Sequence, residues 1–123
     1  MRKVTLFLIL ILTVAACGSA GEGDPADIVE SYLQAKVDGD KEALGSLLCS
    51  EMEAILERES RTFESVSDVS IDGMACERVA DSDSVRCEGK IVALYGAEET
   101  EFVLASYRVV QEDGEWKWCG EAP

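Results

Sequence analysis

The fold of this chain is decided by residues 65–95, which read SVSDVSIDGMACERVADSDSVRCEGKIVALY. Apolar and polar side chains alternate along this stretch, and the alternation is interrupted once, at residues 81–84. A period of two residues is typical of β-strands, and a short polar break between two such strands predicts a β-hairpin. One face of the first strand should therefore carry a common set of small and apolar residues: Val69, Ile71, Gly73, Ala75 and Val79.

The position of the turn sets the register of this hairpin. If the turn is centred between Asp81 and Ser82, residues whose numbers sum to 163 lie opposite each other, and Cys76 faces Cys87. Directly opposed residues on antiparallel strands lie close enough for a disulfide. The hairpin therefore predicts a cross-strand Cys76–Cys87 bond.

The chain that follows extends the same sheet. Residues 96–99 predict a turn, and residues 100–111 predict one long strand with apolar side chains on both faces, which is typical of a central position. Asp113-Gly114 is a strong hairpin signal that returns the chain as a last strand. Trp116 and Trp118 share one face of that strand. They belong to the core if helices cover them, and to an interface if they form an exposed patch.

Residues 24–48 precede the sheet and have helical periodicity. Asp24 suits an N-cap and Pro25 the first helical position, while Gly39 is placed to end the helix. A short second helix should begin at Asp40. The apolar positions of these two helices repeat at intervals of three and four residues: Ile28, Val29, Tyr32, Leu33, Val37, Leu44, Leu47 and Leu48.

A third helix is predicted from Ser50. Ser50 and Glu53 have the spacing of a capping box, in which each side chain satisfies a backbone N–H at the helix start. The charged run at residues 57–61 is interpreted as a solvated helix face, on which Glu57 and Arg61 can form an i,i+4 ion pair.

The first seventeen residues predict export and lipid attachment. Arg2 and Lys3 precede an apolar run at residues 4–14, and Val-Ala-Ala-Cys17 ends it like the lipobox of bacterial lipoproteins. About 11 apolar residues at ~1.5 Å each are too short to cross a hydrocarbon core of roughly 30 Å. We therefore expect residues 1–16 to be a signal peptide, residues 17–24 to be a lipidated cysteine with a flexible tether, and an ordinary cleaved signal to be the alternative.

Cysteine parity supports this interpretation. The chain has five cysteines, and lipid on Cys17 leaves four that can pair. With Cys76 and Cys87 paired, Cys49 and Cys119 remain for a second disulfide. Zinc ligands or free thiols are the alternatives, but no Cys-x-x-Cys pair is present and an oxidising compartment favours disulfides.

Composition narrows the functional classes. Removal of residues 1–16 leaves 107 of 123 residues, a length that suits one small domain. These residues carry 9 basic side chains and 25 acidic ones, and this excess of negative charge disfavours nucleic-acid binding. The chain contains no histidine, so Ser-His, Cys-His and His-metal sites are excluded. Asp81 and Asp83 are too few for a calcium site and are interpreted as turn residues. We expect no metal and no cofactor.

The order of these elements resembles the NTF2-like, or cystatin-like, α+β superfamily. The resemblance is carried by the helix at residues 28–33, the segment at residues 37–44, and the terminal hairpin with Asp113-Gly114 and Trp116. It implies that residues 25–123 form one domain with N-terminal helices packed on a curved antiparallel sheet of about four strands. It also implies a conical cavity, which Tyr32, Tyr95 and Tyr107 are candidates to line.

The predicted function follows from this combination. We expect a non-enzymatic binding module for a small ligand or an envelope protein, held on the extracytoplasmic side of a bacterial membrane by lipid on Cys17. One alternative is a structural or assembly protein of the envelope that dimerises through its sheet. The resemblance also admits an enzyme, which without histidine would need a buried Asp or Glu as base and a tyrosine as hydrogen-bond donor.

Overall fold

The structure of the protein, a computed structural model, describes residues 23–123. The predicted signal peptide, the lipidation site Cys17 and all but the end of the tether lie outside these residues. Within residues 23–123, no helix is both long enough and apolar enough to span a membrane.

The first helix begins and ends where the sequence predicts, and the second begins where it predicts. Helix α1 covers Pro25–Asp38 and helix α2 covers Lys41–Leu47. The Asp24 carboxylate accepts a hydrogen bond from the Ala26 N–H at 2.9 Å, and Gly39 ends α1 with a φ of 66°. The Asp40 side chain caps α2 in the same way. Short polar side chains and a left-handed glycine thus set these boundaries.

The third helical segment starts differently from the prediction. It is a 3₁₀ helix, η1, at Ser50–Ile55, which continues into α3 at Leu56–Ser60. The predicted capping box with Glu53 is not formed, because the Ser50 N–H and hydroxyl donate to the Glu112 carboxylate at 3.0 and 2.8 Å. The backbone hydrogen bond from Ser50, followed by that from its hydroxyl, lowers the pKa of Glu112. A distant strand has therefore replaced a local cap.

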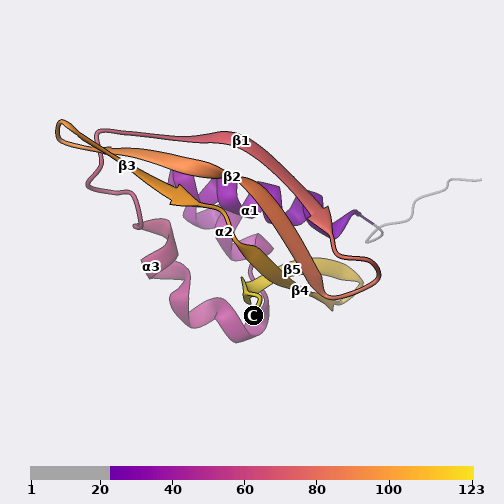
Figure 1. The fold of residues 1–123 in the computed structure, drawn as a ribbon. Coiled ribbons are helices and arrows are strands. Elements are labelled where there is room, and N and C mark those ends of the chain that lie inside the picture. The colour runs from indigo at the N-terminus through magenta and orange to yellow at the C-terminus, as the bar shows by residue number, and fades with distance from the viewer. Residues whose placement is uncertain (1–22) are drawn as a thin grey trace, which may run out of the picture.

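The sheet has five strands rather than about four. They are β1 (Asp68–Arg78), β2 (Ser84–Tyr95), β3 (Glu98–Val103), β4 (Ser106–Glu112) and β5 (Glu115–Glu121). Their antiparallel order is β1-β2-β4-β5, and β3 also pairs with β2 (Figure 1). The strand predicted at residues 100–111 is broken at Leu104 and Ala105, so that β3 and β4 pair with different parts of β2.

The break at Leu104 and Ala105 lies opposite a sharp bend in the hairpin formed by β1 and β2. The predicted register holds at Cys76 opposite Cys87, but it shifts between Asp72 and Ala75. Gly73 has a φ of 66° and Gly89 a φ of 105°, and a Cβ on Gly89 would lie 2.7 Å from the Asp72 carbonyl oxygen. Only glycines allow this approach, and the resulting bulge curves the sheet around α1.

The bulge also corrects the predicted inner face of β1. Val69 and Ile71 are partly buried as expected, but Ala75 and Val79 are exposed. Beyond Gly73 the partly buried positions are Met74 and Cys76 instead. One inserted residue reverses the faces of every side chain after it, because the side-chain period of a strand is two.

Both predicted cysteine pairs are at disulfide distance. The Cα atoms of Cys76 and Cys87 lie 4.1 Å apart, and those of Cys49 and Cys119 lie 5.3 Å apart. The second bond joins the junction between α2 and η1 to the last strand, β5. In the chain-entropy model its loop stabilises the fold by roughly 4 kcal/mol, compared with about 3 kcal/mol for the short hairpin loop.

One hydrophobic core joins the helices to the concave face of the sheet. Its fully buried side chains are Val29, Tyr32, Leu44, Val85 and Val109. Figure 1 shows β1 and β2 passing over α1, while α3 lies apart from these two strands. Core side chains pack between the two layers, and a cavity remains where α1 and α3 face the strands of the sheet.

Candidate functional site

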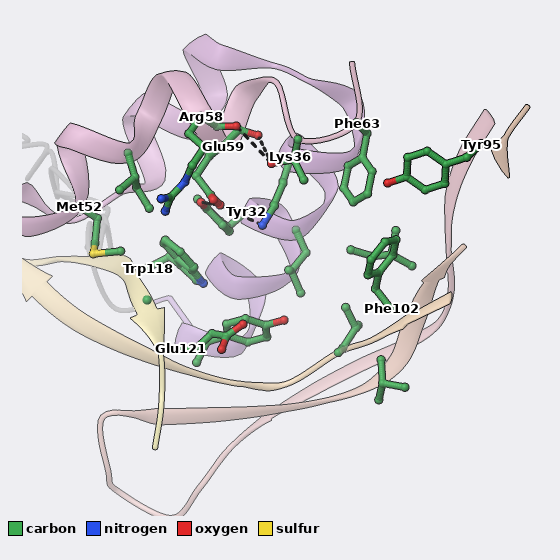
Figure 2. A pocket seen from close by; sticks show the side chains of 18 residues that line it. Tyr32, Lys36, Met52, Arg58, Glu59, Phe63, Tyr95, Phe102, Trp118 and Glu121 are labelled. Carbon is green, nitrogen blue, oxygen red and sulfur yellow. Dashed lines mark hydrogen bonds and ion pairs between the residues drawn. The ribbon is translucent and has the colours of Figure 1, made fainter. Parts of the chain in front are cut away.

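A cavity of about 520 Å³ lies between the helices and the concave face of the sheet. All three tyrosines predicted as pocket residues, Tyr32, Tyr95 and Tyr107, belong to its lining (Figure 2). The rest of the wall is mostly apolar or aromatic, and its polar members are few. The full lining also includes Leu33, Lys36, Met52, Ile55, Arg58, Glu59, Thr62, Phe63, Ile91, Phe102, Val103, Leu104, Trp118, Gly120 and Glu121.

An aromatic stack forms the inner wall. The rings of Tyr32 and Trp118 are stacked with centroids 3.8 Å apart and an interplanar angle of 9°. Tyr107 lies at a tilt to Trp118, with centroids 6.3 Å apart. Tyr32 comes from α1, whereas Trp118 and Tyr107 come from neighbouring strands. Flat apolar surfaces from both layers therefore face one space.

A buried charged group lies beside this stack. The Tyr32 hydroxyl donates to Glu59 Oε2 at 2.5 Å, and Lys36 Nζ lies 3.1 Å from the same oxygen. Glu59 is only 7% exposed. Figure 2 shows Arg58 pointing toward Trp118, on the side of Tyr32 away from the Lys36 nitrogen. The carboxylate is thus compensated by a cation and a phenol in a mainly apolar site.

The tyrosines of the inner wall are held in their protonated form. Burial raises the pKa of Tyr32 well above its usual range, and the hydrogen bond to Glu59 raises it further. Burial also raises the pKa of Tyr107, although the backbone hydrogen bond at Ala105 opposes this effect. The Ala105 N–H donates to the Tyr107 hydroxyl at 3.2 Å. Both phenols remain neutral across the physiological pH range.

The mouth of the cavity is apolar and open. Tyr95 is 39% exposed, Phe102 41% and Val103 83%. Phe63 meets the edge of Phe102 with ring centroids 6.1 Å apart. These residues come from the ends of β2 and β3 and from the segment after α3. An exposed apolar rim next to a cavity suits the entry of a ligand with an apolar body.

The two tryptophans have different surroundings. Trp118 is 5% exposed and lines the cavity, whereas Trp116 lies outside it and lines a separate hollow with Ile28 and Leu47. The Arg78 guanidinium lies 5.0 Å from the centre of the Trp116 ring. Both residues pack against the core rather than forming a common exposed patch.

Three polar residues of the site, Lys36, Arg58 and Glu59, were not among the sequence-predicted site residues. The sequence predicts that the charged run at residues 57–61 is a solvated helix face. This prediction is wrong for Glu59, which is buried. Residues 57 and 59 are separated by about 200° around a helix, so they lie on opposite sides of α3. This angular separation is the signal in the sequence that distinguishes them.

The candidate metal ligands do not form a site of their own. In residues 23–123 the group with suitable spacing is Cys49, Glu51 and Cys119, but its two sulfurs are bonded to each other. Asp81 lies in the turn between β1 and β2, as predicted, and Asp83 follows it there. The Arg78 side chain donates to the Asp81 and Ser82 carbonyl oxygens.

Comparison with known proteins identifies the fold. No family model and no curated protein sequence matches the chain. A solved structure from Streptomyces avermitilis, named a "putative dehydratase from the NTF2-like family", matches 78% of this chain and 92% of its own at a TM-score of 0.54 and 12% identity. A second solved structure, of a substituted chain named Rd1NTF2_05, matches 75% of this chain and 89% of its own length. Its TM-score is 0.53 and its sequence identity is 11%. The protein therefore has the NTF2-like fold.

Proposed function

We propose that this protein is a lipid-anchored binding module of the bacterial cell envelope, and that its NTF2-like domain holds a small amphipathic ligand in the cavity. The observation that carries the proposal is the cavity itself, a hollow of about 520 Å³ with an aromatic inner wall and an exposed apolar rim. Ligand sites of proteins are concave and mainly apolar, with a few polar groups that orient the ligand, and they begin at about 300 Å³.

The lipid anchor is the second part of the proposal and depends on the sequence alone. The lipobox-like Val-Ala-Ala-Cys17 and the parity of the remaining cysteines support it. Only residues 18–24 separate Cys17 from the first residue of α1. A domain held that close to a membrane would take its ligand from the envelope or from the membrane surface.

One observation favours a second function, catalysis by an NTF2-like enzyme. A carboxylate, Glu59, lies within hydrogen-bond distance of a tyrosine, Tyr32, inside the cavity. However, Tyr32 donates its proton to Glu59 rather than toward the cavity, and Lys36 occupies the same carboxylate oxygen. A general base and its electrophilic partner must both be directed at the substrate. The arrangement therefore supports binding better than catalysis.

The binding function can be tested with N-phenyl-1-naphthylamine, an apolar dye that fluoresces when it leaves water. The test protein is residues 17–123 with Cys17→Ser, exported so that both disulfides form, because detergent would itself bind the dye. We expect saturable binding that Ile55→Trp weakens at least tenfold by filling the cavity. Ile28→Trp, a partly buried isoleucine outside the cavity, is the matched control and should bind normally. Equal binding by both variants would contradict the proposed site.

The anchor is tested in the full-length chain. Wild-type protein should partition into the detergent phase and incorporate a labelled fatty acid, while Cys17→Ser should do neither. If Cys17→Ser leaves partitioning and labelling unchanged, the lipoprotein part of the proposal is wrong and the binding part is unaffected.

A further inference from the structure

The indole N–H of Trp118 is a hydrogen-bond donor in the cavity wall. The Trp118 Nε1–H is buried, and no partner accepts from it within residues 23–123. Most buried N–H groups in proteins are paired, because an unpaired one loses its hydrogen bonds to water without replacement, at a cost of about 1–3 kcal/mol. An unpaired N–H group in the wall of a ligand-sized cavity therefore points to an acceptor that the ligand supplies.

The Trp118 ring is fixed in a way that prevents this donor from turning elsewhere. Its face is stacked on Tyr32, and the Trp118 carbonyl accepts from the Cys49 N–H at 2.9 Å. The next residue, Cys119, is bonded to Cys49. Figure 2 shows the ring nitrogen on the side turned away from Met52. The donor is thus preorganised, which reduces the entropy that a ligand loses on binding it.

Two acceptor oxygens of the cavity lining already accept from other donors. Glu59 Oε2 accepts from Tyr32 and lies next to Lys36, and the Tyr107 oxygen accepts from the Ala105 N–H. Glu121 belongs to the lining but is exposed. The charges of the lining balance, with Lys36 and Arg58 against Glu59 and Glu121. The unmet requirement of the wall is therefore for an acceptor oxygen rather than for a net charge.

We infer that the natural ligand has a flat apolar body and an oxygen acceptor, a carbonyl or carboxylate, that binds the Trp118 indole N–H. The inference rests on the proposed binding function and adds the chemical class of the ligand. The flat body would lie along the aromatic wall of Tyr32, Tyr107 and Phe63, with its outer end at the rim formed by Phe102 and Val103.

The test uses three probes of similar shape: 2-acetylnaphthalene, 2-naphthoate and 2-ethylnaphthalene, of which only the last lacks the oxygen. Each is titrated into ¹⁵N-labelled residues 17–123 carrying Cys17→Ser. The chain has two tryptophans, so the spectrum contains two indole N–H signals, and Trp116→Phe assigns them. We expect an acceptor-bearing probe to bind about tenfold more tightly than 2-ethylnaphthalene and to move the Trp118 indole proton downfield.

Trp118→Phe keeps an aromatic ring for the stack with Tyr32 but removes the donor. It should abolish the tenfold preference, so that the acceptor-bearing probes bind no more tightly than 2-ethylnaphthalene, whereas Trp116→Phe should keep the preference. If all three probes bind equally, or if the preference survives Trp118→Phe, the inference is overturned and the proposed binding function stands. If no probe perturbs the cavity signals, the proposed function itself fails, and the inference fails with it.

Discussion

The two sides of helix α3 carry the same type of residue in opposite environments. On the outer side Glu57 is exposed and pairs with Lys41 and with Arg61, whose Nη2 lies 2.8 Å from Glu57 Oε1. On the inner side Glu59 is buried and holds Tyr32 and Lys36 at a single oxygen. Each glutamate has two partners, so the number of contacts is no guide to which glutamate matters more.

The difference between these two glutamates shows that burial determines how much a charged contact contributes to the stability of this protein. Ion pairs in water are screened, and holding long side chains together costs entropy that offsets most of the gain. A buried carboxylate has lost its hydration, so removal of its charge leaves its partners without a substitute. The outer cluster should be dispensable, and the inner one should determine both stability and the shape of the cavity.

The largest effect is expected from Glu59→Gln. The amide has the same size but no charge, so Lys36 loses its counter-ion and Tyr32 keeps only a neutral acceptor. We expect the free energy of unfolding to fall by about 2 kcal/mol, below the 3–5 typical of a broken buried pair because Lys36 still reaches water. Urea unfolding under non-reducing conditions measures this change. A loss too small to measure would show that the inner cluster is no more important than the outer one.

The inner cluster should also make the protein sensitive to alkali. The pKa of Tyr32 is raised in the folded state, so above pH 10 an unfolded chain releases a proton that the folded chain retains. Stability is therefore fully present below pH 10 and falls as the pH rises, by about 1.4 kcal/mol per pH unit from this tyrosine. Tyr107 shifts in the same direction and adds to the slope. Urea titrations between pH 9 and 11 test the sign, and a flat profile would contradict it.

A smaller effect is expected from Tyr32→Phe at neutral pH. The ring remains to stack on Trp118, and the hydrogen bond to Glu59 is lost, which should cost about 1.5 kcal/mol. The same variant should remove the part of the alkaline slope that comes from Tyr32. If the slope is unchanged in Tyr32→Phe, the loss of stability in alkali arises elsewhere, with Tyr107 as the first candidate.

The sequence predicts the order of the elements better than their details. Caps at Asp24 and Gly39 depend on neighbouring residues, so local chemistry locates α1. The cysteine register could be counted from the turn, because Cys76 and Cys87 lie between the turn and the bulge. The bulge at Gly73 could not be predicted, since it depends on the close approach of Gly89 across the hairpin. Likewise, Glu112 displaces the local cap at Ser50 only because the folded sheet brings it there.

The site was predictable to a similar extent. Tyr32 could be assigned to the apolar stripe of α1, and the resemblance to a cavity-forming fold made the tyrosines candidates. Glu59 could not be separated from Glu57 by composition, since both belong to one charged run. Its angular position places it on the inner side, but α3 has only five residues, so its orientation depends on the packing of the whole helical layer.

The smallest effect should come from Glu57→Gln, the matched control for Glu59→Gln. The hydrogen bond from Lys41 lowers the pKa of Glu57, and the nearby Arg61 charge lowers it further, so the contribution of this group is present above its unfolded pKa and lost as the pH falls. Because Glu57 is exposed, salt and water screen the interaction, and we expect an unfolding midpoint indistinguishable from wild type at physiological ionic strength. Dye binding should also be unchanged, since Glu57 is outside the cavity lining. A change in either measurement as large as that of Glu59→Gln would mean that α3 acts as one electrostatic unit, and that burial does not separate its two sides.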